Sequence, residues 1–205
     1  MFNRTAMRLP YGIILAGGRG ARLALGPKHA VVLGGRTLLA HARARIAPQV
    51  SALALSINDE VPDEARDLTI LRDRDANRGG PMMGVLSGLE WAARAGADYL
   101  VSVPVDAPFL PEDLTRRLCD GGAGGAAYAA HDDTAFNVCA LWPTSALQAV
   151  HSLVTETGVR RVRYVLDALE AARVSFSSPE AKRFLNINTA EDLRQAEEFL
   201  AAGET

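Results

Sequence analysis

Two glycines and several cations follow a short apolar run near the start of the chain. The run over residues 12–16 stops at Gly17 and Gly18, and Arg22 and Lys28 follow at wider spacing. Glycine has no Cβ, so the backbone can adopt positive φ and bring its N–H groups close to a ligand. The stretch therefore predicts a buried strand that opens into an anion-binding loop, for which a triphosphate is the natural ligand. The alternative is an ordinary glycine-rich turn with solvated basic side chains.

Two familiar phosphate-binding loops do not fit this stretch. The dinucleotide fingerprint G-x-G-x-x-G would need a third glycine where Leu23 stands. The P-loop needs a hydroxyl residue after its lysine, and His29 follows Lys28. Any phosphate site here belongs to another class.

Polar residues follow three further predicted strands. Residues 52–57 and 68–71 are predicted strands that end at Asn58 and near Asp73, and residues 99–103 are a predicted strand followed closely by Asp106. In open parallel sheets, ligands bind at the carboxyl ends of the strands. These residues are therefore expected to share one crevice with the glycine loop. The alternatives are a turn-forming role for Asp106 and a surface charge cluster at Asp73.

The rest of the chain alternates helices and strands in a way that indicates an α/β fold. We predict a three-layer α/β/α, Rossmann-like arrangement with a mostly parallel sheet and an antiparallel edge. A glycine-rich turn is expected over residues 78–84, a helix opened by Pro111, and a last helix capped by Thr189. The antiparallel part is expected from two strands, residues 126–130 and 137–142, around a polar turn.

Composition limits the class of protein. With 205 residues, 48% of them hydrophobic, the chain can bury a substantial core in one domain. A formal net charge of −2 argues against general binding to nucleic acids or membrane surfaces. Cys119 and Cys139 show neither disulfide nor zinc spacing, and no segment reads as a signal peptide or membrane span, so a cytoplasmic protein is expected.

Four stretches of the chain together carry a family resemblance. They are Leu-Ala-Gly-Gly at residues 15–18 with Arg22 and Lys28 behind it, Gly-Pro-Met-Met-Gly at 80–84, Val-Pro-Val-Asp-Ala-Pro-Phe at 103–109, and Asn-Ile-Asn-Thr-Ala-Glu-Asp-Leu at 186–193. Taken together, the chain resembles the nucleotidyltransferases of the glycosyltransferase-A-like fold, and within them the molybdenum cofactor guanylyltransferase family. The resemblance implies a single domain over residues 8–205, with a nucleotide-binding half at about 8–110 and an acceptor-binding half at about 111–205.

The resemblance implies transfer of GMP from GTP to molybdopterin, with release of pyrophosphate and with Mg²⁺ held by Asp106. The implied catalytic residues are Arg22, Lys28 and Asp106. Those implied to bind the nucleotide are Leu15, Ala16, Gly17, Gly18, Lys28, Asn58, Asp73, Gly80, Pro81 and Asp106, and those implied to bind the acceptor are Arg160, Arg161, Asn186 and Asn188. The implied protein partners are those that deliver molybdopterin or mature molybdoenzymes.

The chain departs from the family pattern at three places. Pro27 stands where an acidic residue commonly precedes the lysine, and Val105 replaces a cysteine. Residues 134–138 differ from the usual acceptor-side sequence. The alternatives are therefore a molybdopterin cytidylyltransferase, a sugar-phosphate nucleotidyltransferase, or a nucleotide-binding module without turnover.

Overall fold

A single seven-stranded sheet forms the centre of the protein. The computed structural model describes residues 8–16, 26–73, 80–177, 180 and 182–203. The strand order is β5-β4-β1-β6-β8-β7-β9. The strands are β1 (Tyr11–Leu15), β4 (Ala52–Ser56), β5 (Thr69–Leu71), β6 (Tyr99–Pro104), β7 (Ala127–His131), β8 (Thr134–Pro143) and β9 (Ala172–Ser175). The pairings of β8 with β6 and β7 are antiparallel and the others are parallel. The predicted mostly parallel sheet with an antiparallel part is confirmed, but the antiparallel strand β8 lies inside the sheet between β6 and β7 and not at its edge.

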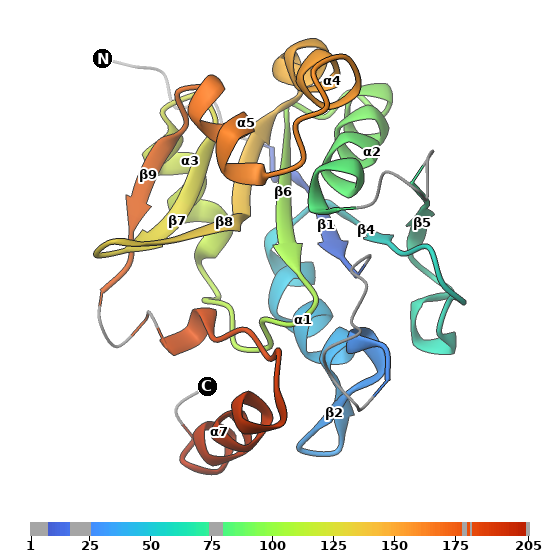
Figure 1. Ribbon diagram of the computed structural model, residues 1–205, viewed down its shortest axis with the longest axis vertical. Coiled ribbons are helices and arrows are strands. Elements are labelled where there is room, and N and C mark those ends of the chain that lie inside the picture. The colour runs from blue at the N-terminus through green and yellow to red at the C-terminus, as the bar shows by residue number, and fades with distance from the viewer. Residues whose placement is uncertain (1–7, 17–25, 74–79, 178–179, 181, 204–205) are drawn as a thin grey trace.

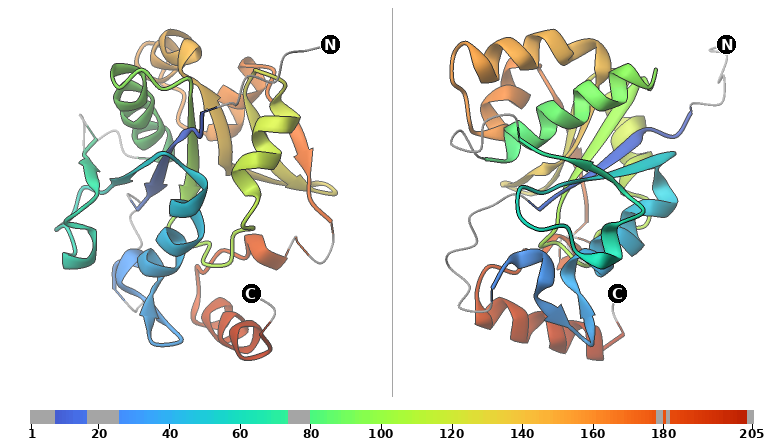
Figure 2. Two further views of the ribbon diagram at one scale, coloured as in Figure 1. Left: turned by 180° about the vertical axis from the view of Figure 1, so that it is seen from behind. Right: turned by 90° about the vertical axis from the view of Figure 1, so that its right-hand side faces the viewer.

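Helices cover both faces of the sheet, which confirms the predicted three layers (Figures 1 and 2). One face carries α2 (Pro81–Arg94), α4 (Leu147–Thr155) and α5 (Val162–Ala168), and the other carries α1 (Leu38–Ile46) and α3 (Leu114–Gly122). Short 3₁₀ turns connect these elements: η2 (Ala47–Gln49), η3 (Asp63–Ala65), η5 (Thr144–Ala146) and η6 (Lys182–Phe184). No described helix combines the length and the apolar character needed to cross a bilayer.

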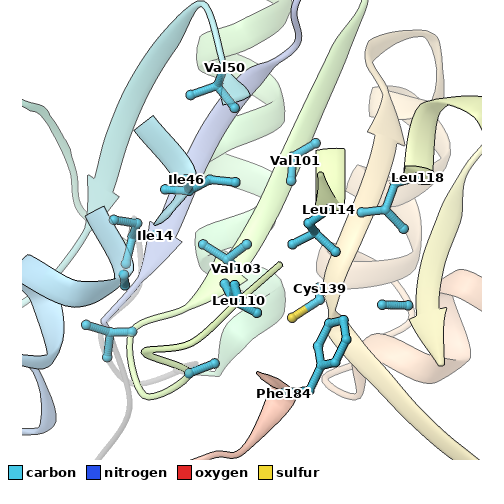
Figure 3. Close-up of a cluster of buried hydrophobic side chains, with 14 of the residues drawn as sticks. Ile14, Ile46, Val50, Val101, Val103, Leu110, Leu114, Leu118, Cys139 and Phe184 are labelled. Atoms are coloured by element: carbon cyan, nitrogen blue, oxygen red, sulfur yellow. The ribbon is translucent and has the colours of Figure 1, made fainter. Parts of the chain in front are cut away.

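The central strands are apolar on both faces because helices cover both. In β1, Ile14 packs with the α1 and α3 side chains, whereas its neighbour Ile13 packs with those of α2. Figure 3 shows Ile46 of α1 and Leu114 of α3 over the sheet residues Ile14 and Val101. This alternation fixes the register of β1, because a slip by one residue would exchange the two faces.

Besides the sheet and its two helical layers, a smaller unit lies beyond the carboxyl ends of β1 and β6 (Figure 1). It consists of η1 (Lys28–Ala30), the hairpin of β2 (Val32–Leu33) and β3 (Arg36–Thr37), and the last helix α7 (Ala190–Ala201). Thr189 caps α7 with a capping box that includes Asp192, which confirms the predicted cap. This unit brings Lys28 of η1 and the segment before α7 to the same end of the sheet.

Two expected element boundaries are wrong. Residues 81–84, predicted as part of a turn, form the first turn of α2, because Pro81 is well suited to the first helical position. The helix expected to open at Pro111 begins at Leu114 instead. There the backbone N–H of Thr115 donates to the Gln49 side chain at 2.9 Å, so a residue distant in sequence satisfies the first turn.

Strand β8 carries a bulge that a buried serine bridges. Tyr128 pairs with Ala140, but the next residue, Ala129, pairs with Phe136, so residues 137–139 are extra. The Ser102 hydroxyl donates to the Val138 carbonyl at 2.7 Å and accepts the Trp142 indole N–H at 2.9 Å. The serine therefore joins the Trp142 indole to the backbone at the bulge.

We expect Ser102→Ala to lower the free energy of unfolding by about 1–3 kcal/mol for each unpaired group, because the Trp142 N–H and the Val138 carbonyl lose their partner. Urea denaturation measures the loss. Ser152→Ala is the control, since that hydroxyl donates to Glu156 in an exposed position. Equal effects of the two substitutions would contradict the prediction.

Candidate active site

Three segments far apart in sequence meet at the Lys28 ammonium group. Its Nζ atom forms an ion pair with Asp106 Oδ2 and donates to Asn188 Oδ1 at 2.6 Å. Asp106 is nearly buried, and the Lys28 side chain is 22% exposed. The cluster thus places one partly exposed cation between a carboxylate and an amide oxygen at the carboxyl end of the sheet.

Hydrogen bonds from backbone N–H groups position Asp106 and Asn188. The Val105 N–H donates to the Leu15 carbonyl at 3.1 Å, which ties the turn after β6 to the end of β1. The Ile187 N–H donates to the Asp106 carbonyl at 2.9 Å, which brings the carboxyl-terminal segment alongside. The Asn188 N–H donates to Asp192 at 2.8 Å, within the cap of α7. Asn188 is therefore positioned by the start of a helix.

Pro27 has a structural role in this site. It precedes η1 with φ of −65°, and its carbonyl accepts the Ala30 N–H at 2.9 Å. Proline restricts φ to about this value, so it fixes how the chain enters the turn that carries Lys28. Val105 is buried in the core between the sheet and α1, where a small apolar side chain fits. Two of the three departures from the family pattern thus have a structural account.

A small hydrophobic core joins the segments that carry Lys28, Asp106 and Asn188. Leu33, Phe109 and Ile187 come one from each segment, and they pack with Ala196 of α7. The Phe109 and Phe199 rings lie 4.8 Å apart. This core therefore holds together the three segments that carry the polar residues.

The buried cysteine beside Asp106 is not a nucleophile. Burial raises the pKa of the Cys139 thiol far above its usual range, and the nearby Asp106 carboxylate raises it further. Burial also raises the pKa of Cys119, to about 11. Both thiols stay protonated near neutral pH, and nucleophilic attack requires the thiolate. Covalent catalysis through either cysteine does not fit this site.

Asn58 and Asp73 form a closed hydrogen-bonded pair after β4 and β5. Asn58 Nδ2 donates to Asp73 Oδ2 at 2.8 Å, and the Asp73 N–H donates to Asn58 Oδ1 at 2.9 Å. The Oδ1 atom of Asp73 is buried and has no hydrogen-bond partner within the described part of the chain. Burial raises the pKa of the Asp73 carboxyl, and the Asn58 hydrogen bond offsets part of this. An unpaired buried acceptor of this kind suits a ligand that brings its own donor.

The raised pKa of Asp73 predicts a specific pH dependence of stability. As pH rises above the ordinary Asp pKa, the unfolded chain releases its proton first, so the folded protein loses stability until the pH passes the raised pKa. We therefore expect wild type to lose stability relative to Asp73→Asn across this window, measured by urea denaturation.

Asp67 supplies a control of opposite sign for this measurement. Hydrogen bonds from Arg43 hold the pKa of Asp67 below its ordinary value. Wild type should therefore gain stability relative to Asp67→Asn as pH rises from the lowered pKa of Asp67 to the ordinary Asp pKa, a window that lies below that of Asp73. The same sign for both pairs would contradict the assignment of Asp73.

The structure brings some of the predicted nucleotide residues together. The Ala16 N–H donates to the Ser56 carbonyl at 2.9 Å, which joins the ends of β1 and β4. Gly80 precedes α2 with φ of +138°, a conformation that favours glycine, and Pro81 begins the helix. A Cβ at Gly84 would lie 2.7 Å from Leu15 Cδ2, so the first turn of α2 packs directly on the end of β1. Gly17, Gly18 and Arg22 lie outside the described residues.

The predicted acceptor residues do not form one cluster. Arg160 donates to the Val154 carbonyl at 2.9 Å, and the Arg161 guanidinium lies 5.8 Å from the centre of the Tyr164 ring. Figure 1 shows the first turn of α5, which follows them, on the same face of the sheet as α2. Asn186 contributes its carbonyl to a long contact from Asn188 at 3.4 Å, whereas Asn188 itself contacts Lys28. The contact between Asn188 and Lys28 has no signal in the sequence, since 160 residues separate them.

A family model described as "MobA-like NTP transferase domain" matches residues 12–173. A protein of Cereibacter sphaeroides named molybdenum cofactor guanylyltransferase is 42% identical over 195 residues, which cover 95% of this chain and 98% of the relative. A protein of the same name from Acidiphilium cryptum is 41% identical over 90% of this chain and 92% of its own length.

Solved structures show the same fold. Molybdopterin-guanine dinucleotide biosynthesis protein A from Archaeoglobus fulgidus superposes with a TM-score of 0.72 at 24% identity, covering 94% of this chain and 99% of that one. The 2-C-methyl-D-erythritol 4-phosphate cytidylyltransferase of Thermus thermophilus gives a TM-score of 0.69 at 19% identity, covering 95% and 100%. At these identities the likeness extends to the fold alone.

Proposed function

This chain belongs to the MobA-like NTP transferase family, and we propose that it is a molybdenum cofactor guanylyltransferase, which transfers GMP from GTP to molybdopterin and releases pyrophosphate. The observation that carries the proposal is the convergence of Lys28 and Asp106 beyond β1 and β6, in a chain 42% identical to proteins of that name. Nucleotidyl transfer needs positive charge at that point, because nucleotide and acceptor are both polyanions.

The chemistry requires positioning and charge more than proton transfer. A phosphate monoester is largely deprotonated near neutral pH, so the acceptor needs no strong general base. Lys28 is held by its neighbours where the strand ends meet, and its flexible stem lets the ammonium follow a phosphate group. Catalysis would then come from orienting the reactants and from offsetting their charge.

We propose that Asp106 and Asn188 hold Mg²⁺ with the nucleotide. Carboxylate and amide oxygens are the hard donors that this ion prefers, and both already converge on one cation, the Lys28 ammonium. The described residues include no group of three or more His, Cys, Asp or Glu that could hold a metal by themselves. Nucleotide phosphates and water would complete the shell, which is usual for Mg²⁺, and the ion would supply charge neutralisation at the phosphates.

We propose that the Asn58–Asp73 pair binds the nucleoside. The Oδ1 atom of Asp73, which has no hydrogen-bond partner among the described residues, can accept a hydrogen bond from the donor edge of guanine or from a ribose hydroxyl. Gly80 and Pro81, at the start of α2, would pass close to the same part of the nucleotide. Leu15 and Ala16, with the adjacent glycines, would supply backbone around it.

We propose that Arg160, Arg161 and Asn186 contact different parts of the acceptor, and we assign Asn188, which was also expected to bind the acceptor, to the metal instead. Arg161→Ala is expected to raise the KM for molybdopterin by about tenfold with little change in GTP affinity, because loss of one charged hydrogen bond costs about 1.5–3 kcal/mol. Arg163→Ala is the matched control, since that side chain pairs with Asp167 on exposed α5 surface. Equal losses of GTP and molybdopterin binding in Arg161→Ala would remove it from the acceptor site.

The proposed function is tested by the nucleotide that stabilises the protein. With Mg²⁺ present, GTP is expected to raise the melting temperature more than CTP or ATP does, and pyrophosphate is expected to appear when molybdopterin is added. Preference for CTP would support a cytidylyltransferase. Stabilisation by GTP without pyrophosphate release would support a nucleotide-binding module. A cytoplasmic location and protein partners that deliver molybdopterin or receive the product stay predictions.

A further inference from the structure

We propose that Lys28 acts as a built-in cation that excludes divalent metal from Asp106 until a nucleotide binds. The inference rests on the proposed function, because it concerns the site that would hold the Mg²⁺ of Mg·GTP. It goes beyond a phosphate-binding role for Lys28, since it assigns that side chain a second position and a second task in the nucleotide-free protein.

The geometry that carries this inference is the position of the ammonium group. Lys28 Nζ forms an ion pair with Asp106 Oδ2 and lies 2.6 Å from Asn188 Oδ1, so both oxygens suited to a metal already contact one cation. Pro27 fixes the backbone before Lys28, and the Asn188 N–H donates to Asp192 within the cap of α7. The backbone on both sides of the ammonium is therefore fixed, whereas the flexible Lys28 side chain can change its position.

Charge makes the two cations competitors. Asp106 is the one acidic side chain to which Lys28 is bonded among the described residues, and it is nearly buried. A divalent ion beside the ammonium would place two cations against one carboxylate and leave excess positive charge there, which is unfavourable. Without a nucleotide, the metal must displace Lys28, and the displaced ammonium then loses its carboxylate partner.

A nucleotide removes this conflict because its phosphates bring several negative charges. They offer Lys28 new partners and offer the metal additional oxygen ligands, so the ammonium can leave Asp106 without losing ion pairing. Metal and nucleotide are thus expected to bind cooperatively, and the metal alone is expected to bind weakly.

The test is a titration of the nucleotide-free protein with Mn²⁺, followed by the loss of the electron paramagnetic resonance signal of free Mn²⁺. Lys28→Met is expected to bind one Mn²⁺ about tenfold or more tightly than wild type, because the competing charge is gone. Lys28→Arg keeps the charge and should stay as weak as wild type. Lys182→Met, which removes an exposed lysine in η6, is the matched control and should change nothing.

The double variant Lys28→Met/Asp106→Asn locates the metal. It should lose the gained affinity, and Mn²⁺ alone should raise the melting temperature of Lys28→Met but of neither wild type nor the double variant. Equal Mn²⁺ affinity in wild type and Lys28→Met would overturn the inference, as would a gain that persists without the Asp106 carboxylate. Failure of the proposed function would instead appear as wild type that releases no pyrophosphate from GTP, which leaves this nucleotide-free comparison unaffected.

Discussion

Asp106→Asn is expected to lower the rate of pyrophosphate release by about 10²–10³-fold, the usual cost of removing one electrostatic group from an active site. The substitution keeps the shape of the side chain and removes its charge. Lys28 then loses its ion-pair partner, and the proposed metal loses its carboxylate ligand. GTP binding should weaken less than turnover, because the phosphates still meet Lys28.

The fold should survive this substitution, since Asp106 lies at the edge of the core and its backbone contact with Ile187 does not involve the side chain. Asp98→Asn is the matched control, because Asp98 is an exposed residue just before the other end of β6. The control should keep wild-type turnover and melting temperature. Near wild-type pyrophosphate release by Asp106→Asn would refute the role of this carboxylate.

Phe109→Ala is expected to lower turnover, although the Phe109 side chain takes no direct part in the proposed chemistry. Phe109 is almost fully buried in the small core that joins Lys28, Asp106 and Asn188, and its ring packs against Phe199 of α7. Truncating a buried phenylalanine lowers the free energy of unfolding by about 3–5 kcal/mol. The loss to the rest of the fold is smaller if only α7 separates from it. We expect hydrogen exchange to accelerate in α7 and turnover to fall, because Asn188 loses its position beside Lys28.

Leu89→Ala separates loss of position from loss of stability. Leu89 is fully buried on α2, in the core on the opposite side of the sheet from α1, and its truncation costs about 2–5 kcal/mol. Assayed well below its melting temperature, this variant should keep normal exchange in α7 and near-normal turnover. Wild-type exchange and turnover in Phe109→Ala would contradict the positioning role of the small core.

The sequence alone predicted the features that depend on near neighbours. The apolar run of residues 12–16 predicted a buried strand, and β1 is indeed buried on both faces. Thr189 and Asp192 stand three residues apart, which is all that a capping box requires. Polar residues after the predicted strands also placed Asn58 and Asp73 together, because parallel strands end at the same edge of a sheet.

Only the tertiary structure decided what depends on packing across long separations. The Gln49 side chain accepts a hydrogen bond from the first turn of α3, which begins later than the sequence predicted. The register of β8 shifts at the bulge that Ser102 bridges. Lys28 meets Asp106 across 78 residues and Asn188 across 160. No local pattern encodes those contacts, because a separate hydrophobic core under α7 brings the segments together. The sequence thus determined which residues are candidates for the chemistry. The packing of the last helix decided which of them contact the Lys28 ammonium group.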